Sequence, residues 1–207
     1  MFIVSISGNI GVGKSTILEV LKSLGHKVIM EGINRGAWSS LLQEYYRNPK
    51  RCSFHFQTVV LIDIYNQIRK AKTNKVIQKY DFLFTERSCI DCFAFASVAH
   101  VQGNLSDLEF ETFKNIYKKF SLVPHIVITL QLDTITCLRR IRNRGRPCEE
   151  NIDIQYLDLV ESETKKSLRQ QTEQCLPLIK NIFVKCYNRD VDSIVEEILS
   201  KIKKLNL

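Results

Sequence analysis

The sequence is poor in the residues that divide a chain into separate parts. Its 207 residues include eight Gly and four Pro, and no repeat, low-complexity block or linker rich in either residue interrupts them. We therefore expect one domain over residues 1–207. No apolar run reaches the roughly 18 residues of a membrane-spanning helix, and no basic leader precedes the first one. This predicts a cytoplasmic protein without a membrane partner.

A disulfide framework and a zinc site are also not expected. The seven cysteines are odd in number and widely scattered, which is typical of reduced thiols. Cys89 and Cys92 have C-x-x-C spacing, but the four histidines supply no partner pair at a metal-binding spacing. We expect thiols that pack in the core.

Basic residues exceed acidic ones, since 30 Lys and Arg against 22 Asp and Glu give a net charge of +8. This excess favours an anionic partner without saying which anion. Five arginines fall at positions 139, 140, 142, 144 and 146. Such a cluster suits the phosphates of a small molecule or those of a nucleic acid, and both alternatives remain at this stage.

Short apolar runs alternate with helix-compatible segments along the chain. This alternation predicts an α/β fold in which a five-stranded parallel sheet is flanked by helices. Ligands of such sheets bind beyond the carboxyl ends of the strands, where Gly8, Glu31 and the Glu86-Arg87 pair follow strand runs. The expected strands cover Phe2–Ser7, Lys27–Met30, Phe82–Thr85, Ile126–Leu132 and Ile182–Cys186.

The segment Gly8–Ser15 matches the phosphate-binding pattern G-x-x-x-x-G-K-[ST] between a strand and an amphipathic helix. Its backbone amides would converge on phosphate oxygens at the positive end of the helix. Lys14 would bridge the terminal phosphates of ATP, and Ser15 would ligate Mg²⁺. The expected ATP-binding residues here are Gly8, Asn9, Ile10, Gly11, Val12, Gly13, Lys14, Ser15 and Thr16.

Four motifs in this order resemble those of the deoxyribonucleoside kinase family. They are the phosphate loop, Glu31 followed by Trp38, the Glu86-Arg87-Ser88 triplet, and two longer segments, Leu41–Gln57 and Arg140–Tyr156. The apolar residues expected around the base resemble those of the pyrimidine-preferring, mitochondrial thymidine kinase-like branch. The resemblance implies a doubly wound P-loop kinase architecture, a small-molecule deoxynucleoside and ATP as substrates, no nucleic-acid partner, and a homodimer.

Phosphorylation of a 5′-hydroxyl needs a base for its proton and cations over the phosphoryl group. We expect Glu31 to be that base, as the resemblance also implies. Arg87 would hold the 5′-oxygen and Glu31 in register, and Glu86 would share Mg²⁺ with Ser15. The predicted catalytic residues are therefore Glu31, Arg87 and Lys14.

Several residues are expected to bind the nucleoside. The amide of Gln57 complements a pyrimidine edge, and Phe56 and Trp38 could sandwich the ring or simply pack in the core. The resemblance implies that Tyr46 and Glu149 bind the sugar 3′-hydroxyl and disfavour a 2′-hydroxyl.

Arginines at every second position would point in different directions on a helix. We therefore expect a mobile loop, over about residues 140–152, that closes on the phosphates. Arg140, Arg144 and Arg146 would neutralise charge on the phosphoryl group, whereas Arg142 would be solvated.

The base and the acceptor stay open. In purine-accepting relatives an aspartate takes the place of Cys92, so an apolar Cys92 favours a pyrimidine, but a one-residue gap would bring Asp91 there instead. The alternative reaction is that of a thymidylate kinase, and a third reading is a basic nucleic-acid-binding protein with a vestigial phosphate loop.

Overall fold

Five parallel strands form one sheet in the computed structural model, which describes residues 1–32, 38–174 and 179–205. The strand order is β2-β3-β1-β4-β5, with β1 in the centre. This confirms the predicted five-stranded parallel sheet. The strands are β1 (Phe2–Ser7), β2 (Lys27–Ile29), β3 (Phe82–Glu86), β4 (Ile126–Gln131) and β5 (Lys180–Lys185).

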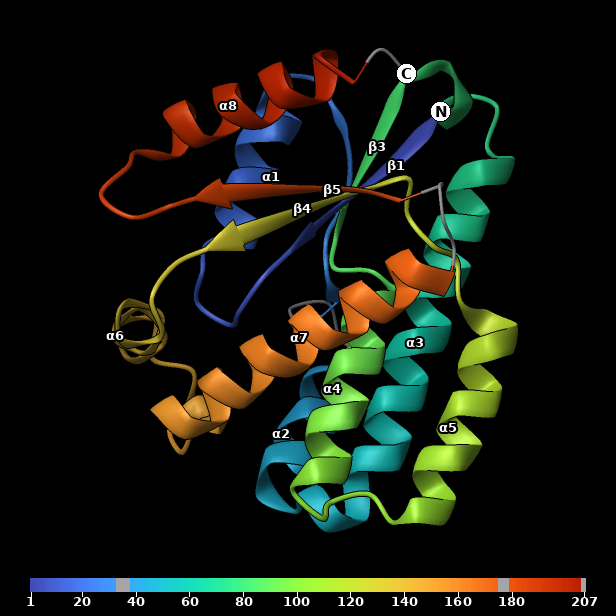
Figure 1. Cartoon of the computed structure of the whole chain (residues 1–207), viewed down its shortest axis with the longest axis vertical. Helices are drawn as coiled ribbons and strands as arrows, with labels where there is room; N and C mark the ends of the chain where they lie inside the picture. The colour runs from blue at the N-terminus through green and yellow to red at the C-terminus, as the bar shows by residue number, and fades with distance from the viewer. Residues whose placement is uncertain (33–37, 175–178, 206–207) are drawn as a thin grey trace.

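Helices cover both faces of the sheet (Figure 1). One face carries α1 (Lys14–Ser23) and α8 (Val191–Lys203). The opposite side carries α2 (Ser39–Arg47), α3 (Pro49–Thr73), α4 (Cys89–Val101), α5 (Asp107–Phe120) and α7 (Ile154–Gln174). The helix α6 (Thr134–Arg144) lies beyond the end of β4, and short 3₁₀ turns cover Ile77–Lys79 and Pro147–Glu149.

The alternation of side chains along each strand explains these two layers. Val4 and Ile6 of β1 belong to the apolar cluster under α1 and α8, whereas Ile3 belongs to the cluster formed with α2–α5. Because both faces are buried, every strand position needs a residue that packs. The sheet is thereby held rigidly, and its carboxyl edge is a fixed platform for the loops that follow the strands.

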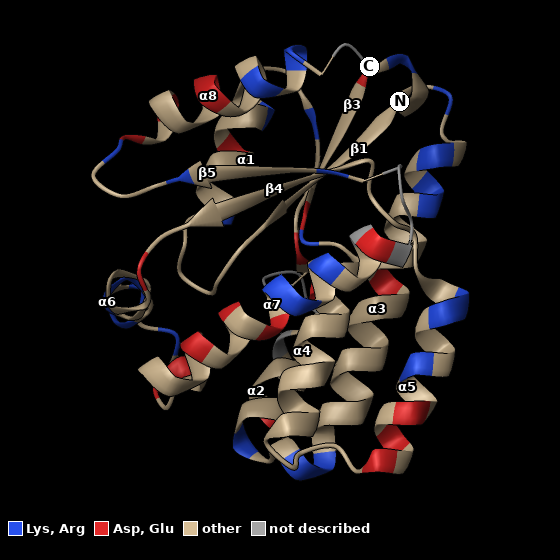
Figure 2. Ribbon diagram, viewed as in Figure 1, with Lys and Arg blue, Asp and Glu red and all other residues tan. Residues whose placement is uncertain are grey.

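Charge is distributed over many elements. Figure 2 shows basic and acidic residues together on α5, while α4 carries almost none, as expected for a helix surrounded by others. Within the described ranges, no helix combines the length and the apolar character needed to span a membrane.

Candidate active site

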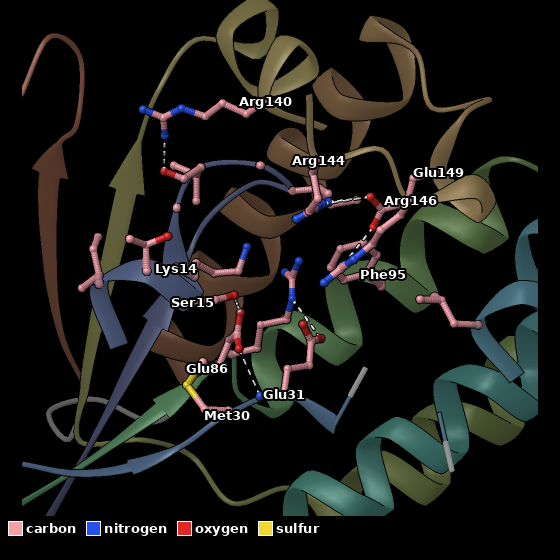
Figure 3. Close-up of a pocket in the computed structure, with 18 of the residues that line it drawn as sticks. Lys14, Ser15, Met30, Glu31, Glu86, Phe95, Arg140, Arg144, Arg146 and Glu149 are labelled. Carbon is pink, nitrogen blue, oxygen red and sulfur yellow. Dashed lines mark hydrogen bonds and ion pairs between the residues drawn. The ribbon is translucent and has the colours of Figure 1, made fainter. Parts of the chain in front are cut away.

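A cavity of about 600 Å³ opens at the carboxyl edge of the sheet. Its walls come from the phosphate loop, from α2, α3 and the start of α4, and from the segment around α6 (Figure 3). Most of the residues predicted from sequence line it together: Ile10, Gly11, Val12, Gly13, Lys14, Ser15, Thr16, Glu31, Tyr46, Phe56, Gln57, Glu86, Arg87, Arg140, Arg144, Arg146 and Glu149.

The phosphate loop is shaped by its contacts behind the cavity. Gly11 has a φ of 81°, and a side chain there would come within 2.5 Å of the Cys137 carbonyl oxygen of α6, so glycine is required. The Asn9 amide donates to the Leu157 carbonyl oxygen at 2.9 Å. Asn9 and Gly8 are therefore described as part of the loop scaffold rather than of the cavity wall.

Lys14 is buried inside the loop. Its Nζ donates to the carbonyl oxygens of Asn9 at 2.8 Å and Gly8 at 3.1 Å. Burial and the nearby Arg87 guanidinium lower the pKa of Lys14 to about 7. The amine is thus poised to become fully charged when an anion enters the cavity.

We predict that this ionisation makes ATP binding depend on pH. A bound phosphate raises the pKa of Lys14, so binding at pH 8 takes up a proton, and affinity falls as pH rises through about 7. Calorimetry of a non-hydrolysable ATP analogue in two buffers of different ionisation enthalpy measures the uptake. The Lys14→Ala variant should lose it, and equal proton counts in both proteins would contradict the assignment.

Three carboxyl ends of the sheet meet through Glu86. Its Oε1 accepts a hydrogen bond from Ser15 Oγ at 2.6 Å, and its Oε2 accepts from the Glu31 backbone N–H at 3.1 Å. The Glu31 Oε1 in turn lies 3.2 Å from Arg87 Nε (Figure 3). The side chains predicted to hold a metal and to act on the hydroxyl are thereby joined in one network.

Arg87 is held in an unusual backbone conformation. Its φ is 64°, which is uncommon outside glycine, and its backbone N–H donates to the Ile6 carbonyl oxygen at 3.0 Å. The guanidinium carbon lies 4.5 Å from the centre of the Phe95 ring. Among the described residues, its buried Nη1 has no hydrogen-bond partner. Strain of this kind clusters at functional sites, and the free donor faces the network.

The environment of Glu31 suits a base. Burial raises the pKa of Glu31, and the adjacent Arg87 opposes that rise. The carboxylate therefore stays ionised near neutrality while it is desolvated, which favours proton transfer to it.

Gln57 and Phe56 lie at the other end of the cavity. The Gln57 side chain is 1% exposed, and its Nε2 has no hydrogen-bond partner within the described part of the chain. Phe56 stacks on Tyr45, with ring centres 4.8 Å apart. The cavity thus has a polar group without a partner next to aromatic faces, as a planar ligand requires.

Trp38 differs from its expected place. It is 4% exposed, packs against Gly32 and belongs to the core cluster. It is absent from the described lining of the cavity. The longer interval between Glu31 and Trp38 places this ring in the core, which was the alternative interpretation.

The structure also decides between Cys92 and Asp91. Cys92 and Val60 line the cavity, whereas Asp91 is absent from the described lining. Asp91 accepts from Ser7 Oγ at 2.5 Å and from the Ser88 N–H at 2.8 Å, so it caps α4. The wall beside Gln57 is therefore apolar.

The predicted loop is wrong for residues 140–144, because they belong to α6. Asp133 caps this helix, Cys137 and Ile141 form its buried stripe, and Gly145 ends it in a left-handed conformation. The helix is stable here because its apolar spacing outweighs the scatter of its arginines.

The arginines consequently diverge. Arg140 donates to the Val12 carbonyl oxygen at 2.9 Å. Arg144 and Arg146 pair with the buried Glu149, at 2.6 and 3.2 Å (Figure 3). Arg142 was expected to be solvated, but it donates to backbone carbonyl oxygens, including that of Ile152 at 2.7 Å, and ties the 3₁₀ turn to α6.

The thiols behave as expected where they can be described. Cys52, Cys89, Cys92, Cys137 and Cys186 are buried and Cys148 is half-buried, all without disulfides, and Cys175 lies outside the described residues. No group of three or more His, Cys, Asp or Glu side chains suited to a metal occurs in those residues.

Three comparisons with known proteins agree. A family model described as deoxynucleoside kinase matches residues 4–205. A probable deoxycytidine kinase of Fowlpox virus is 29% identical over 185 residues, covering 82% of this chain and 73% of the relative. A putative deoxynucleoside kinase of Frog virus 3 is 30% identical over 163 residues, covering 77% and 79%.

A solved structure shares the fold. The deoxyadenosine kinase of M. mycoides superposes with a TM-score of 0.80 at 24% identity, covering 98% of this chain and 99% of that one. The sheet, the phosphate loop and the Glu31–Arg87 network thus lie in a chain that the family model matches almost from end to end. This protein belongs to the deoxynucleoside kinase family.

Proposed function

We propose that this kinase transfers the γ-phosphoryl group of ATP to the 5′-hydroxyl of a pyrimidine deoxynucleoside, giving the 5′-monophosphate and ADP. One observation carries the proposal. A single cavity has the phosphate loop at one end, the unpartnered amide of Gln57 at the other, and the Glu31–Arg87 ion pair among its lining residues. The reacting groups would therefore meet in one enclosure.

The side chains divide the chemistry between them. Glu31 would accept the proton of the 5′-hydroxyl, and the free Nη1 of Arg87 would hold its oxygen. Lys14 and Arg140 would stabilise the phosphates.

Arg144 and Arg146 would also turn to the phosphoryl group, and this requires them to leave Glu149. The Glu149 carboxylate would then accept a hydrogen bond from the sugar 3′-hydroxyl, close to Tyr46. Occupancy of the sugar and phosphate subsites would thus be linked.

Magnesium is part of the proposal. Ser15 Oγ and the Glu86 carboxylate lie 2.6 Å apart and provide the hard oxygen ligands that Mg²⁺ prefers. One carboxylate is enough when substrate phosphates supply further ligands. The bound ion would neutralise charge on the transferring phosphates.

The proposed base preference depends on the wall of the pocket. Val60 and Cys92 offer no ionic partner beside Gln57, which suits a pyrimidine ring. Names of relatives differ on this point, since a Bacillus subtilis relative is a deoxyadenosine/deoxycytidine kinase and a Dictyostelium discoideum relative is a deoxyguanosine kinase. The expected homodimer and the cytoplasmic location also stay predictions.

We predict that labelled ATP will be consumed with deoxycytidine or thymidine at least about tenfold faster than with deoxyadenosine or deoxyguanosine. One apolar contact or one hydrogen bond is worth roughly this factor in kcat/KM. Thymidylate, assayed in parallel, distinguishes the alternative reaction, and faster phosphorylation of thymidylate than of thymidine would refute the assigned acceptor. Tight DNA binding that falls steeply with salt, without ATP turnover, would favour the nucleic-acid alternative.

A further inference from the structure

Two tyrosines that the sequence did not single out bring hydroxyl groups to the Gln57 end of the cavity. Tyr45 on α2 and Tyr156 in the first turns of α7 both line it. Tyr45 is 4% exposed, and its hydroxyl is close enough to Gln57 and Tyr156 for both to affect its pKa. The three side chains come from different helices and form one polar cluster in an otherwise apolar and aromatic wall.

This cluster has unused hydrogen-bonding capacity. Over the part of the chain that the structure describes, the buried Tyr156 hydroxyl and the Gln57 Nε2 have no hydrogen-bond partner. Buried polar groups are nearly always paired, by protein, water or ligand. Two such atoms in the wall of the same cavity indicate a ligand that presents hydrogen-bonding groups to both.

The chemistry of the cluster distinguishes between bases. Burial raises the pKa of Tyr45 and of Tyr156, so both hydroxyls stay neutral and can accept as well as donate. An exocyclic amino group has two N–H donors. Gln57 Oε1 can accept one of them while Nε2 donates to the adjacent ring nitrogen, and the second donor needs another acceptor beside Gln57.

A thymine edge suits this cluster less well. Its carbonyl oxygen has no N–H to give to a hydroxyl acceptor, and the neighbouring methyl group would remove a hydroxyl from a polar partner. A pocket of purely apolar side chains would accept that methyl group, but a pocket with two buried hydroxyls disfavours it.

We propose that Tyr45 and Tyr156 complete, with Gln57, a recognition site for an exocyclic amino group, so that the enzyme prefers deoxycytidine to deoxyuridine and thymidine. The inference rests on the proposed function and names the base within it. Both tyrosines act on specificity and take no part in phosphoryl transfer.

Four nucleosides test the inference: deoxycytidine, 5-methyldeoxycytidine, deoxyuridine and thymidine. They vary the amino group and the methyl group independently. Each is assayed with the wild type, with Tyr45→Phe, with Tyr156→Phe and with the double variant. Phenylalanine removes only the hydroxyl, so the stacking of residue 45 on Phe56 is kept. Tyr65→Phe, on the same helix as Gln57 but remote from the cavity lining, is the matched control.

The wild type should favour deoxycytidine over deoxyuridine in kcat/KM, and the double variant should reduce that ratio about tenfold, the value of one hydrogen bond lost. The change should come from the KM for deoxycytidine, while the KM for ATP stays constant and Tyr65→Phe behaves as wild type. The ratio is internal to each preparation, so partial misfolding does not alter it.

Two results would overturn the inference while the proposed function stands: a wild type that phosphorylates deoxyuridine or thymidine as well as deoxycytidine, or an active double variant with an unchanged ratio. A wild type that binds ATP but phosphorylates no deoxynucleoside would instead overturn the proposed function itself.

Discussion

Replacement of Glu31 by Gln is expected to lower kcat by about 10²- to 10⁴-fold, the usual contribution of a positioned general base. The amide keeps the size of the side chain and can still contact Arg87, which lies 3.2 Å from the carboxylate, but it cannot accept the proton of the 5′-hydroxyl. Binding of ATP should change little, because the phosphate loop is untouched. Single-turnover kinetics with saturating substrates measure the effect.

The pH profile gives this prediction a second readout. Burial raises the pKa of Glu31, and a base must be deprotonated, so wild-type activity should fall as the pH drops through a value above the usual carboxylate range. The Glu31→Gln variant should lack that acidic limb. Glu44→Gln, an exposed residue of α2, is the control. An unchanged kcat in Glu31→Gln would remove this carboxylate from the mechanism.

Replacement of Lys14 by Ala is expected to reduce kcat/KM for ATP by about 10²- to 10³-fold, as loss of one preorganised donor to a developing negative charge commonly does. Lys14 is 6% exposed, so water cannot readily replace its ammonium group. Part of the loss should appear in kcat, because the charge it would stabilise grows in the transition state.

The measurement is steady-state kinetics at varied ATP, together with the thermal shift caused by deoxynucleoside alone. That shift should persist in Lys14→Ala, since Gln57 and its neighbours are untouched. Lys75→Ala, which removes an exposed lysine that the cavity lining does not include, is the control for net charge. A variant that keeps wild-type kcat/KM would show that the arginines suffice.

Some of this protein is encoded in short stretches of sequence. Apolar runs gave the five strands, and the phosphate loop between a strand and a helix placed Lys14 and Ser15 correctly in the cavity wall. Glu31, Glu86 and Arg87 followed from the same argument, because parallel strands end at one edge. These features depend on local periodicity and on backbone geometry, which a single segment determines.

Other features were decided only when distant segments packed together. A register of one residue separates Cys92 in the cavity from Asp91 under the sheet, and the choice came from Ser7, 84 positions away from Asp91. Tyr45 and Tyr156 meet across 111 positions, although neither matches a motif by itself. Sequence spacing cannot show such meetings, because they depend on the relative placement of helices that only the packed core sets.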